Sequence, residues 1–208
     1  MSLYPPQHHQ ESQFKNVIKT IETFPLAQLI SVYENKPIIT HLPLRYSRNE
    51  KFGMLSGHID NNNPQLKNLK QGVTSTIVFN GPDTYISPSI YNTKQLPTWN
   101  YIKVHLEGKV NRILSNDELK MEMIELTKFL EGSDQKYILE KEDPRMEAFV
   151  NYVTGFELEI TAWEGKFKLS QDKNKKDQTA AKQALTTNYT DVIPIYLDSV
   201  YTNHIKKG

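Results

Sequence analysis

Residues 79–110 read FNGPDTYISPSIYNTKQLPTWNYIKVHLEGKV. In the second half of this stretch, Ile102, Val104 and Leu106 alternate with polar and charged residues. A period of two places the apolar side chains on one face, which is typical of a half-buried β-strand. The stretch therefore predicts a strand that ends near Val110.

The first half of the stretch cannot form a helix. Three prolines each remove a backbone donor and push the preceding residue out of the α region: Pro82, Pro88 and Pro97. We therefore expect a strand, a rigid loop and a second strand. Aromatic, hydroxyl and amide side chains gather near this loop: Tyr85, Ser87, Tyr91, Thr98, Trp99 and Asn100. Such a loop suits a flat ligand with polar edges, and it equally suits a well-packed hairpin with no ligand.

Hydrophobic periodicity predicts further elements on both sides. The expected helices are 13–23, 64–70, 115–130, 143–154 and 177–185. The expected strands are 26–32, 36–42, 53–59, 73–79 and 156–163, with a turn at Glu164-Gly165 and a return strand at 167–170. Ser115 and Glu118 form a capping box at the start of the clearest helix.

These elements predict a mainly β protein with α-helices, of the α+β class. Helices inserted between many strands indicate one β-barrel with peripheral helices. The chain of 208 residues contains no internal repeat and no Gly/Ser-rich linker. We therefore expect a single domain, 1–208, with an extended arm at 1–12 and a tail of uncertain docking at 187–208.

Composition excludes several classes of protein. Twenty-five Lys and Arg residues against 24 Asp and Glu give a net charge of +1, without the basic footprint of a DNA-binding domain. The chain has no cysteine, which excludes disulfides and thiolate metal sites. It has neither an apolar run of membrane-spanning length nor a signal peptide at its start. We expect a cytoplasmic protein without membrane contact.

Common catalytic motifs are absent. The sequence contains no GxGxxG, GxxxxGK[ST], HExxH or GxSxG motif, so catalytic residues stay unknown. His8 and His9 are adjacent and would point apart on a regular element, which favours two exposed arm histidines over a metal site. We expect no bound metal.

Several segments, in this order, resemble the PaiB family of FMN-binding proteins, often named negative transcriptional regulators. They are LYPP (3–6), FPLAQLIS (24–31), THLPL (40–44), LSGHIDNNNP (55–64), GPDTYISPSIY (81–91), LPTWNY (96–101), VHLEGKV (104–110) and GFELEITAWEGKFKLSQDK (155–173). The resemblance implies an FMN-binding split β-barrel of Greek-key topology, related to pyridoxamine-phosphate oxidases. It also implies a homodimer with a regulatory role, and DNA enters as a partner only through this resemblance.

FMN needs cations or hydroxyls for its phosphate, amides for the ring edge and flat apolar surface for the ring face. The resembling segments carry such groups at strand ends, and we predict these cofactor-binding residues: Thr40, His41, His58, Asn63, Ser87, Tyr91, Thr98, Trp99, Asn100, Lys168, Ser170 and Gln171. We expect Lys168 and Ser170, with Thr40 or Ser87, at the phosphate. Trp99 and Asn100 are expected against the isoalloxazine ring or a dimer seam.

Two alternative functions stay open. A flavin-dependent oxidoreductase could use the same barrel, with FMN as electron carrier. A binding module could keep the barrel without the cofactor. Arg45 and Arg48, in a segment predicted as a polar loop, are further candidates for a phosphate contact.

Overall fold

The computed structural model describes residues 5–187, and the statements below concern these residues. The prediction of an uncertain tail at 187–208 therefore falls, beyond Thr187, outside the described residues. The chain divides into two compact units. The first comprises Met1–Gly81 and Lys103–Lys166, and the second comprises Pro82–Ile102 and Phe167–Gly208. The prediction of a single domain stays a prediction.

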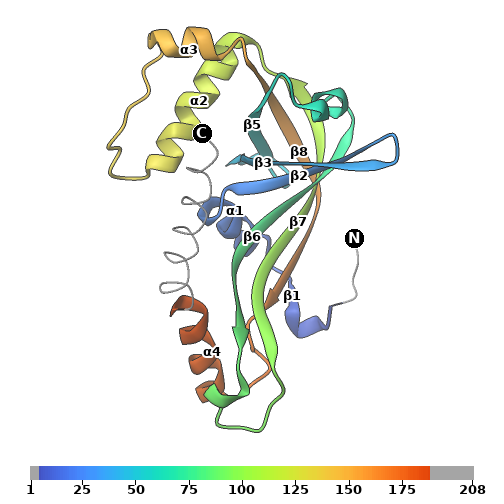
Figure 1. Cartoon of the computed structure of the whole chain (residues 1–208), viewed down its shortest axis with the longest axis vertical. Helices are drawn as coiled ribbons and strands as arrows, with labels where there is room; N and C mark the ends of the chain where they lie inside the picture. The colour runs from blue at the N-terminus through green and yellow to red at the C-terminus, as the bar shows by residue number, and fades with distance from the viewer. Residues whose placement is uncertain (1–4, 188–208) are drawn as a thin grey trace, which may run out of the picture. The chain divides into compact units, whose positions relative to one another are not determined.

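The described strands form one sheet in the order β3-β2-β6-β7-β8-β5-β4, and β1 also pairs with β8 (Figure 1). Their bounds are β1 Gln10–Glu11, β2 Leu26–Tyr33, β3 Lys36–Pro43, β4 Arg45–Ser47, β5 Met54–Asp60, β6 Thr74–Ile86, β7 Thr98–Ile113 and β8 Val153–Lys168. Every pairing whose register is defined is antiparallel. The expected mainly β fold with helices between strands is confirmed.

The helices follow the predicted pattern. Their bounds are α1 Phe14–Thr23, α2 Asn116–Glu131, α3 Pro144–Phe149 and α4 Lys175–Thr187, with short 3-10 turns η1 Gln7–His9, η2 Pro64–Asn68 and η3 Pro88–Ile90. The capping box of Ser115 and Glu118 is present at the start of α2. None of the helices between residues 5 and 187 combines the length and apolar character needed to cross a membrane.

The core of the first unit lies where strand alternation predicts it. In β8, Phe156, Leu158 and Ile160 are buried while the residues between them reach solvent. Leu119 of α2 packs with Val150 and Val153 in a buried cluster. Leu119 and Leu126 of α2 therefore pack within the chain, whereas Leu130 stays 52% exposed.

Strand β6 is longer than the predicted strand at 73–79. The strand runs through Pro82 to Ile86, and the loop covers only the residues between β6 and β7. The registered pairing of β2 with β6 ends at Phe79. Beyond this point a proline without a backbone donor costs the ladder nothing on that side.

Strand β8 also continues where a turn was predicted at Glu164-Gly165. β1 supplies the reason: Glu11 pairs with Gly165 and Gln10 with Lys166, so the ladder extends past the expected turn. The predicted return strand at 167–170 is wrong, because β8 continues to Lys168 and ends there.

The helix predicted at 143–154 is shorter. Asp143 caps it and Pro144 is its first residue, as expected, but α3 ends at Phe149. Val153 and its neighbour already belong to β8, where Val153 pairs with Asp60 of β5. Pairing with β5 therefore places in a strand the β-branched residues that the hydrophobic pattern had assigned to a helix.

Candidate functional site

In the second unit, three predicted residues meet in a polar network. The hydroxyls of Tyr91 and Ser170 share a hydrogen bond of 2.7 Å, and the Asn100 amide Nδ2 donates to Ser170 Oγ at 3.0 Å. Asn100 and Ser170 are buried, with 1% and 4% of their surface exposed. The network ties the loop after β6 to β7 and to the end of β8.

Ser170 adopts a left-handed backbone conformation, with a φ of 61°. This region costs a non-glycine residue roughly 1 kcal/mol or more. A glycine would avoid that cost but would lose the hydroxyl that Tyr91 and Asn100 contact. The strained serine marks the turn after β8 as a functional candidate.

At the last residue of β8, the Lys168 ammonium donates a hydrogen bond to Thr98 Oγ1 at 2.5 Å. The pair is partly buried, and within residues 5–187 Lys168 forms no ion pair with a carboxylate. A cation next to a hydroxyl, without a protein counter-charge, is chemically suited to a phosphate.

Asp177 of α4 fixes the loop that carries Tyr91. Its carboxylate is fully buried and accepts hydrogen bonds from the Asn92 backbone N–H at 2.7 Å and the Thr93 hydroxyl at 2.5 Å. Asn174 donates to the same carboxylate and accepts from the first N–H groups of α4. These bonds hold the pKa of Asp177 below its ordinary value. Sequence reasoning missed this residue, although the Asn174-x-x-Asp177 spacing is a helix-start pattern.

The other predicted residues of this unit do not join the network. Ser87 caps η3 through the Ser89 N–H, and the exposed Gln171 side chain bonds back to the Leu169 backbone. Trp99 is half exposed and its ring contacts Tyr85 at 6.3 Å between centroids. These side chains stabilise turns or face solvent.

Trp99 and Asn100 are consecutive residues of β7 with different surroundings. Consecutive strand residues point to opposite faces, and here Trp99 is 50% exposed while Asn100 is 1% exposed. The expectation that both lie against one ring or one seam stays a prediction, and the opposite orientation of the two side chains favours only one of them as a ligand contact. A ligand on one face of β7 meets only one of them.

In the first unit, Asn63 Nδ2 donates to Thr40 Oγ1 at 2.9 Å, so these two predicted residues do meet. Asn63 also caps η2 through the Gln65 N–H. The buried Gln65 amide then donates to the Leu29 carbonyl and to Ser31 Oγ, both at 3.0 Å. The turn after β5 therefore anchors the β2–β3 hairpin that presents Thr40.

His41 and His58, also in the first unit, have different surroundings. His41 is exposed on β3, and its backbone pairs with Gln28 of β2. His58 packs edge-to-face against Phe149 at 6.0 Å, and within the described chain its buried Nδ1 has no hydrogen-bond partner. Burial lowers the pKa of His58, and Glu122 acts in the opposite direction without outweighing it. The folded chain therefore favours the neutral form of this imidazole.

Arg45 is not a free phosphate ligand. Its guanidinium contacts both carboxylate oxygens of Glu122, with Nε to Oε1 at 2.9 Å, and Ser56 Oγ donates to the same Oε1 at 2.6 Å. The segment predicted as a polar loop is in part the strand β4, paired with β5. Glu122 raises the pKa of Arg45 and fixes α2 on β5.

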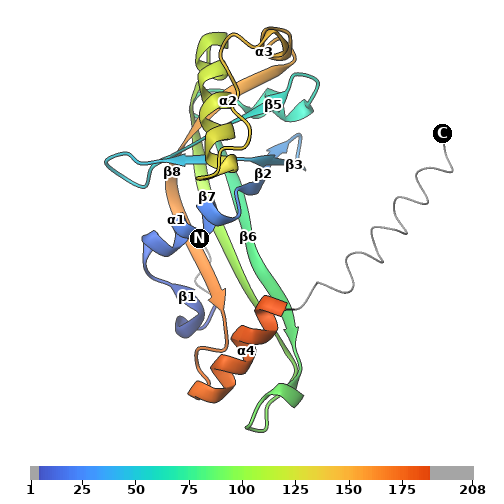
Figure 2. The ribbon, with the colours of Figure 1, turned by 90° about the vertical axis from the view of Figure 1, so that its left-hand side faces the viewer.

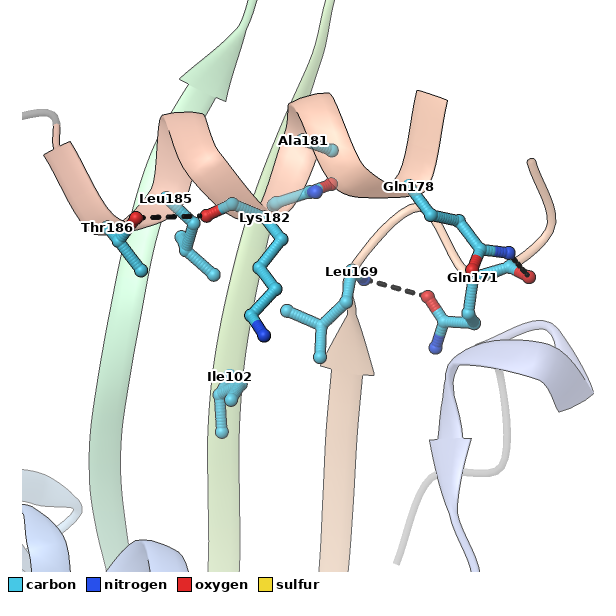
Figure 3. Close-up of a pocket in the computed structure, with 9 residues that line it drawn as sticks. Ile102, Leu169, Gln171, Gln178, Ala181, Lys182, Leu185 and Thr186 are labelled. Atoms are coloured by element: carbon cyan, nitrogen blue, oxygen red, sulfur yellow. Dashed lines mark hydrogen bonds between the residues drawn. The ribbon is translucent and has the colours of Figure 1, made fainter. Parts of the chain in front are cut away.

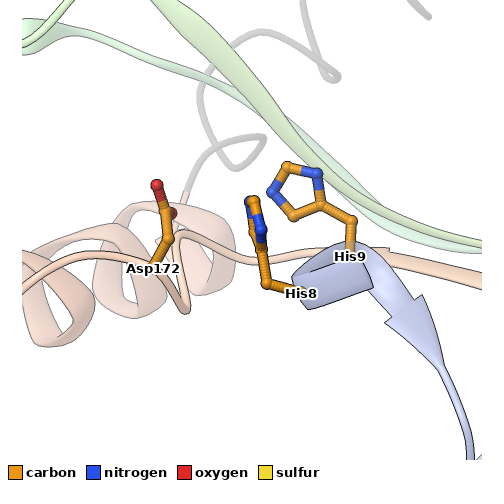
Figure 4. A group of neighbouring side chains, drawn as sticks. All are labelled: His8, His9 and Asp172. Atoms are coloured by element: carbon orange, nitrogen blue, oxygen red, sulfur yellow. The ribbon is translucent and has the colours of Figure 1, made fainter. Parts of the chain in front are cut away.

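The arm histidines lie in η1 and at its end. The rings of His8 and His9 meet edge-to-face, with centroids 4.1 Å apart. Figure 4 shows the two rings on η1. Two rings in edge contact do not by themselves form a metal site.

Comparison with known proteins identifies the family to which the chain is similar. The family described as "Putative FMN-binding domain" matches residues 3–162. The protein "Protease synthase and sporulation protein PAI 2" of Bacillus subtilis is 29% identical over 177 residues, which cover 84% of this chain and 85% of the relative. An uncharacterized protein of Emericella nidulans is 28% identical over 82% of this chain and 85% of its own length.

Solved structures share the fold at low sequence identity. A FAD- and heme-binding protein of Mycobacterium smegmatis superposes with a TM-score of 0.59 at 15% identity, over 83% of this chain and 80% of that chain. The flavocytochrome Anf3 of Azotobacter vinelandii gives a TM-score of 0.56 at 18% identity, over 80% and 72%. The split-barrel fold expected from the sequence is confirmed by these comparisons.

Proposed function

Because the chain belongs to the family of FMN-binding domains, we propose that it is a PaiB-type flavoprotein whose FMN phosphate binds to Lys168 and Thr98. Lys168 carries this proposal, since it is a partly buried cation with a hydroxyl neighbour and no carboxylate partner in the described chain. An ammonium and a hydroxyl donate charge-assisted hydrogen bonds to a phosphate.

The remaining polar groups also fit the cofactor. Tyr91 and the buried Ser170 offer two hydroxyls suited to the edge of a flavin ring. In the first unit, Thr40 and Asn63 form a second, separate polar group, in segments that resemble the family. Bound FMN supplies electron-transfer chemistry, while the polar residues of the second unit bind and orient it.

FMN titration of the Lys168→Ala variant tests the phosphate assignment. Loss of one charge-assisted hydrogen bond is expected to raise the Kd by roughly ten- to a hundredfold, from about 1.5–3 kcal/mol. The matched control is Lys176→Ala, which removes an exposed lysine of α4. An unchanged Kd in a folded Lys168→Ala variant would refute the assignment.

A homodimer is the second part of the proposal. Leu119 and Met146 are buried within the chain, but Leu130 of α2 and Phe149 of α3 are 52% and 43% exposed and leave apolar surface for a partner. Exposed apolar side chains on the β2–β3 hairpin also support a dimer: Leu26 is 60% exposed, Val32 66% and Ile39 52%. Sedimentation at micromolar concentration is expected to show a dimer, and a single 24.1 kDa species would contradict it.

The biological role that we propose is regulatory, on the strength of the family resemblance. A flavin-dependent oxidoreductase is the competing function. Purified protein loaded with FMN separates them, because an oxidoreductase would consume a reduced nicotinamide over many turnovers. We expect no sustained consumption, and transcript levels that change when the chain is replaced by its Lys168→Ala variant in cells.

A further inference from the structure

A pocket lies under α4 in the second unit, and all of its lining residues belong to that unit (Figure 3). Its volume of about 440 Å³ falls within the roughly 300–1,000 Å³ of small-molecule sites. Figure 2 shows α4 alongside the ends of β6 and β7 that belong to the same unit. The pocket therefore has a helix for one wall and strand residues for another.

The walls are mainly apolar. Ile102 of β7, Leu169 after β8, and Ala181 and Leu185 of α4 line the pocket. Ala181 is fully buried, so α4 is fixed in place above the pocket. Asp177, one turn earlier, fastens the same helix to the loop after η3. An apolar body entering this pocket would gain stabilisation from burial without having to order the helix.

Lys182 is the charged residue among those that line the pocket. Figure 3 shows the Lys182 side chain running from α4 toward Ile102, between Leu185 and Leu169. Within the described chain, no carboxylate pairs with the Lys182 ammonium. The Asn100 amide, held by Ser170, adds a fixed polar group to the lining. A cation at the edge of an apolar pocket complements a ligand with an apolar body and an anionic end.

We propose that this pocket binds a small carboxylate with an apolar body, with the carboxylate on Lys182 and the apolar part between Ile102, Leu169 and Leu185. The site is separate from the flavin phosphate assigned to Lys168 and Thr98. It therefore goes beyond flavin binding, and it is tested on the flavin-free protein.

Calorimetric titration of the full chain with octanoate, octanamide and hexanoate tests the proposal. Octanoate is expected to bind about tenfold more tightly than octanamide, because the amide lacks the charge that Lys182 pairs with. It is also expected to bind roughly fifteenfold more tightly than hexanoate, since each of its two additional methylenes contributes about fourfold. Equal affinity of octanoate and octanamide, or no binding of either, would overturn the proposal.

Two variants locate the site. Lys182→Gln is expected to abolish the preference for octanoate over octanamide, whereas Lys176→Gln, an exposed lysine of the same helix outside the pocket lining, is expected to preserve it. Leu185→Trp fills the pocket and is expected to abolish binding of both ligands. An unchanged preference in Lys182→Gln would refute the assignment of the charge.

A competition experiment separates this inference from the flavin proposal. Octanoate affinity is measured again with saturating FMN, and FMN affinity is measured in the Lys182→Gln variant. Both are expected to stay within about twofold of the original values. Competitive displacement of octanoate by FMN would show a single site and overturn the separate carboxylate pocket, while leaving FMN binding itself established.

Discussion

Replacement of Glu122 by methionine tests the charged cluster that fixes α2 on β5. Arg45 donates to both oxygens of Glu122, and Ser56 donates to one of them. The Glu122 and Arg45 side chains are 9% and 23% exposed, so the change would leave a largely desolvated guanidinium without its partner.

The expected cost follows from this burial. An unpaired buried charge typically costs about 3–5 kcal/mol, and the remaining exposure of Arg45 reduces this to about 2–3 kcal/mol. For a chain of this size, each kcal/mol lowers Tm by about 2–4 °C, so a loss of roughly 5–10 °C is expected. Replacing both Arg45 and Glu122 by methionine removes the unpaired charge, and much of the stability should return.

Urea unfolding followed by far-ultraviolet circular dichroism measures both effects. All variants are compared at one protomer concentration, because association with a second copy would raise apparent stability by mass action. The reasoning is refuted if Glu122→Met costs less than about 1 kcal/mol, or if the double variant loses the sum of the two single losses.

Three further outcomes are expected. Burial lowers the pKa of His58 in the folded chain, so the unfolded chain takes up the proton first as the pH drops. The contribution of His58 to the free energy of unfolding is therefore complete above about pH 6.5. It falls below that pH by at most about 1.4 kcal/mol per pH unit. The urea midpoint of His58→Gln should therefore change less than that of the original protein between about pH 7.5 and about pH 5.5, and parallel pH profiles would contradict this. Gln65→Leu removes the donor shared by Leu29 and Ser31 and should cost about 1–3 kcal/mol in urea unfolding, whereas a neutral change would show that water replaces it. With a net charge of +1, the protein should not shift a DNA fragment in a gel at near-physiological salt, and a sharp sequence-specific complex would refute this.

Short sequence patterns predicted the helices and strands that depend mainly on contacts between residues close in sequence. The capping box of Ser115 and Glu118 positions the start of α2, and the alternation around Leu158 defines a strand, because both depend on neighbours within one or two turns. The ends of β6 and β8 were missed. They depend on partners far away in sequence, as in the pairing of Glu11 with Gly165.

The candidate site divides in the same way. Residue types pointed to Lys168, Thr98 and Ser170 as polar groups at strand ends, and these side chains do form bonded groups. No sequence pattern predicted that Asp177 is fully buried or that Lys182 lines a pocket. Both residues lie on α4 in a charged segment, and such a segment is expected to be exposed when its packing partners are unknown.

The strands β6, β7 and β8 have a practical consequence for dissecting this protein. The boundary between the two units crosses the chain after Gly81, after Ile102 and after Lys166, each time inside one of these strands. A fragment cut at any of these points would end in the middle of a hydrogen-bonded ladder and expose a row of unpaired backbone groups. Expression of either unit alone is therefore expected to give aggregates, and limited proteolysis of the native chain should cleave between strands and spare the three boundary points.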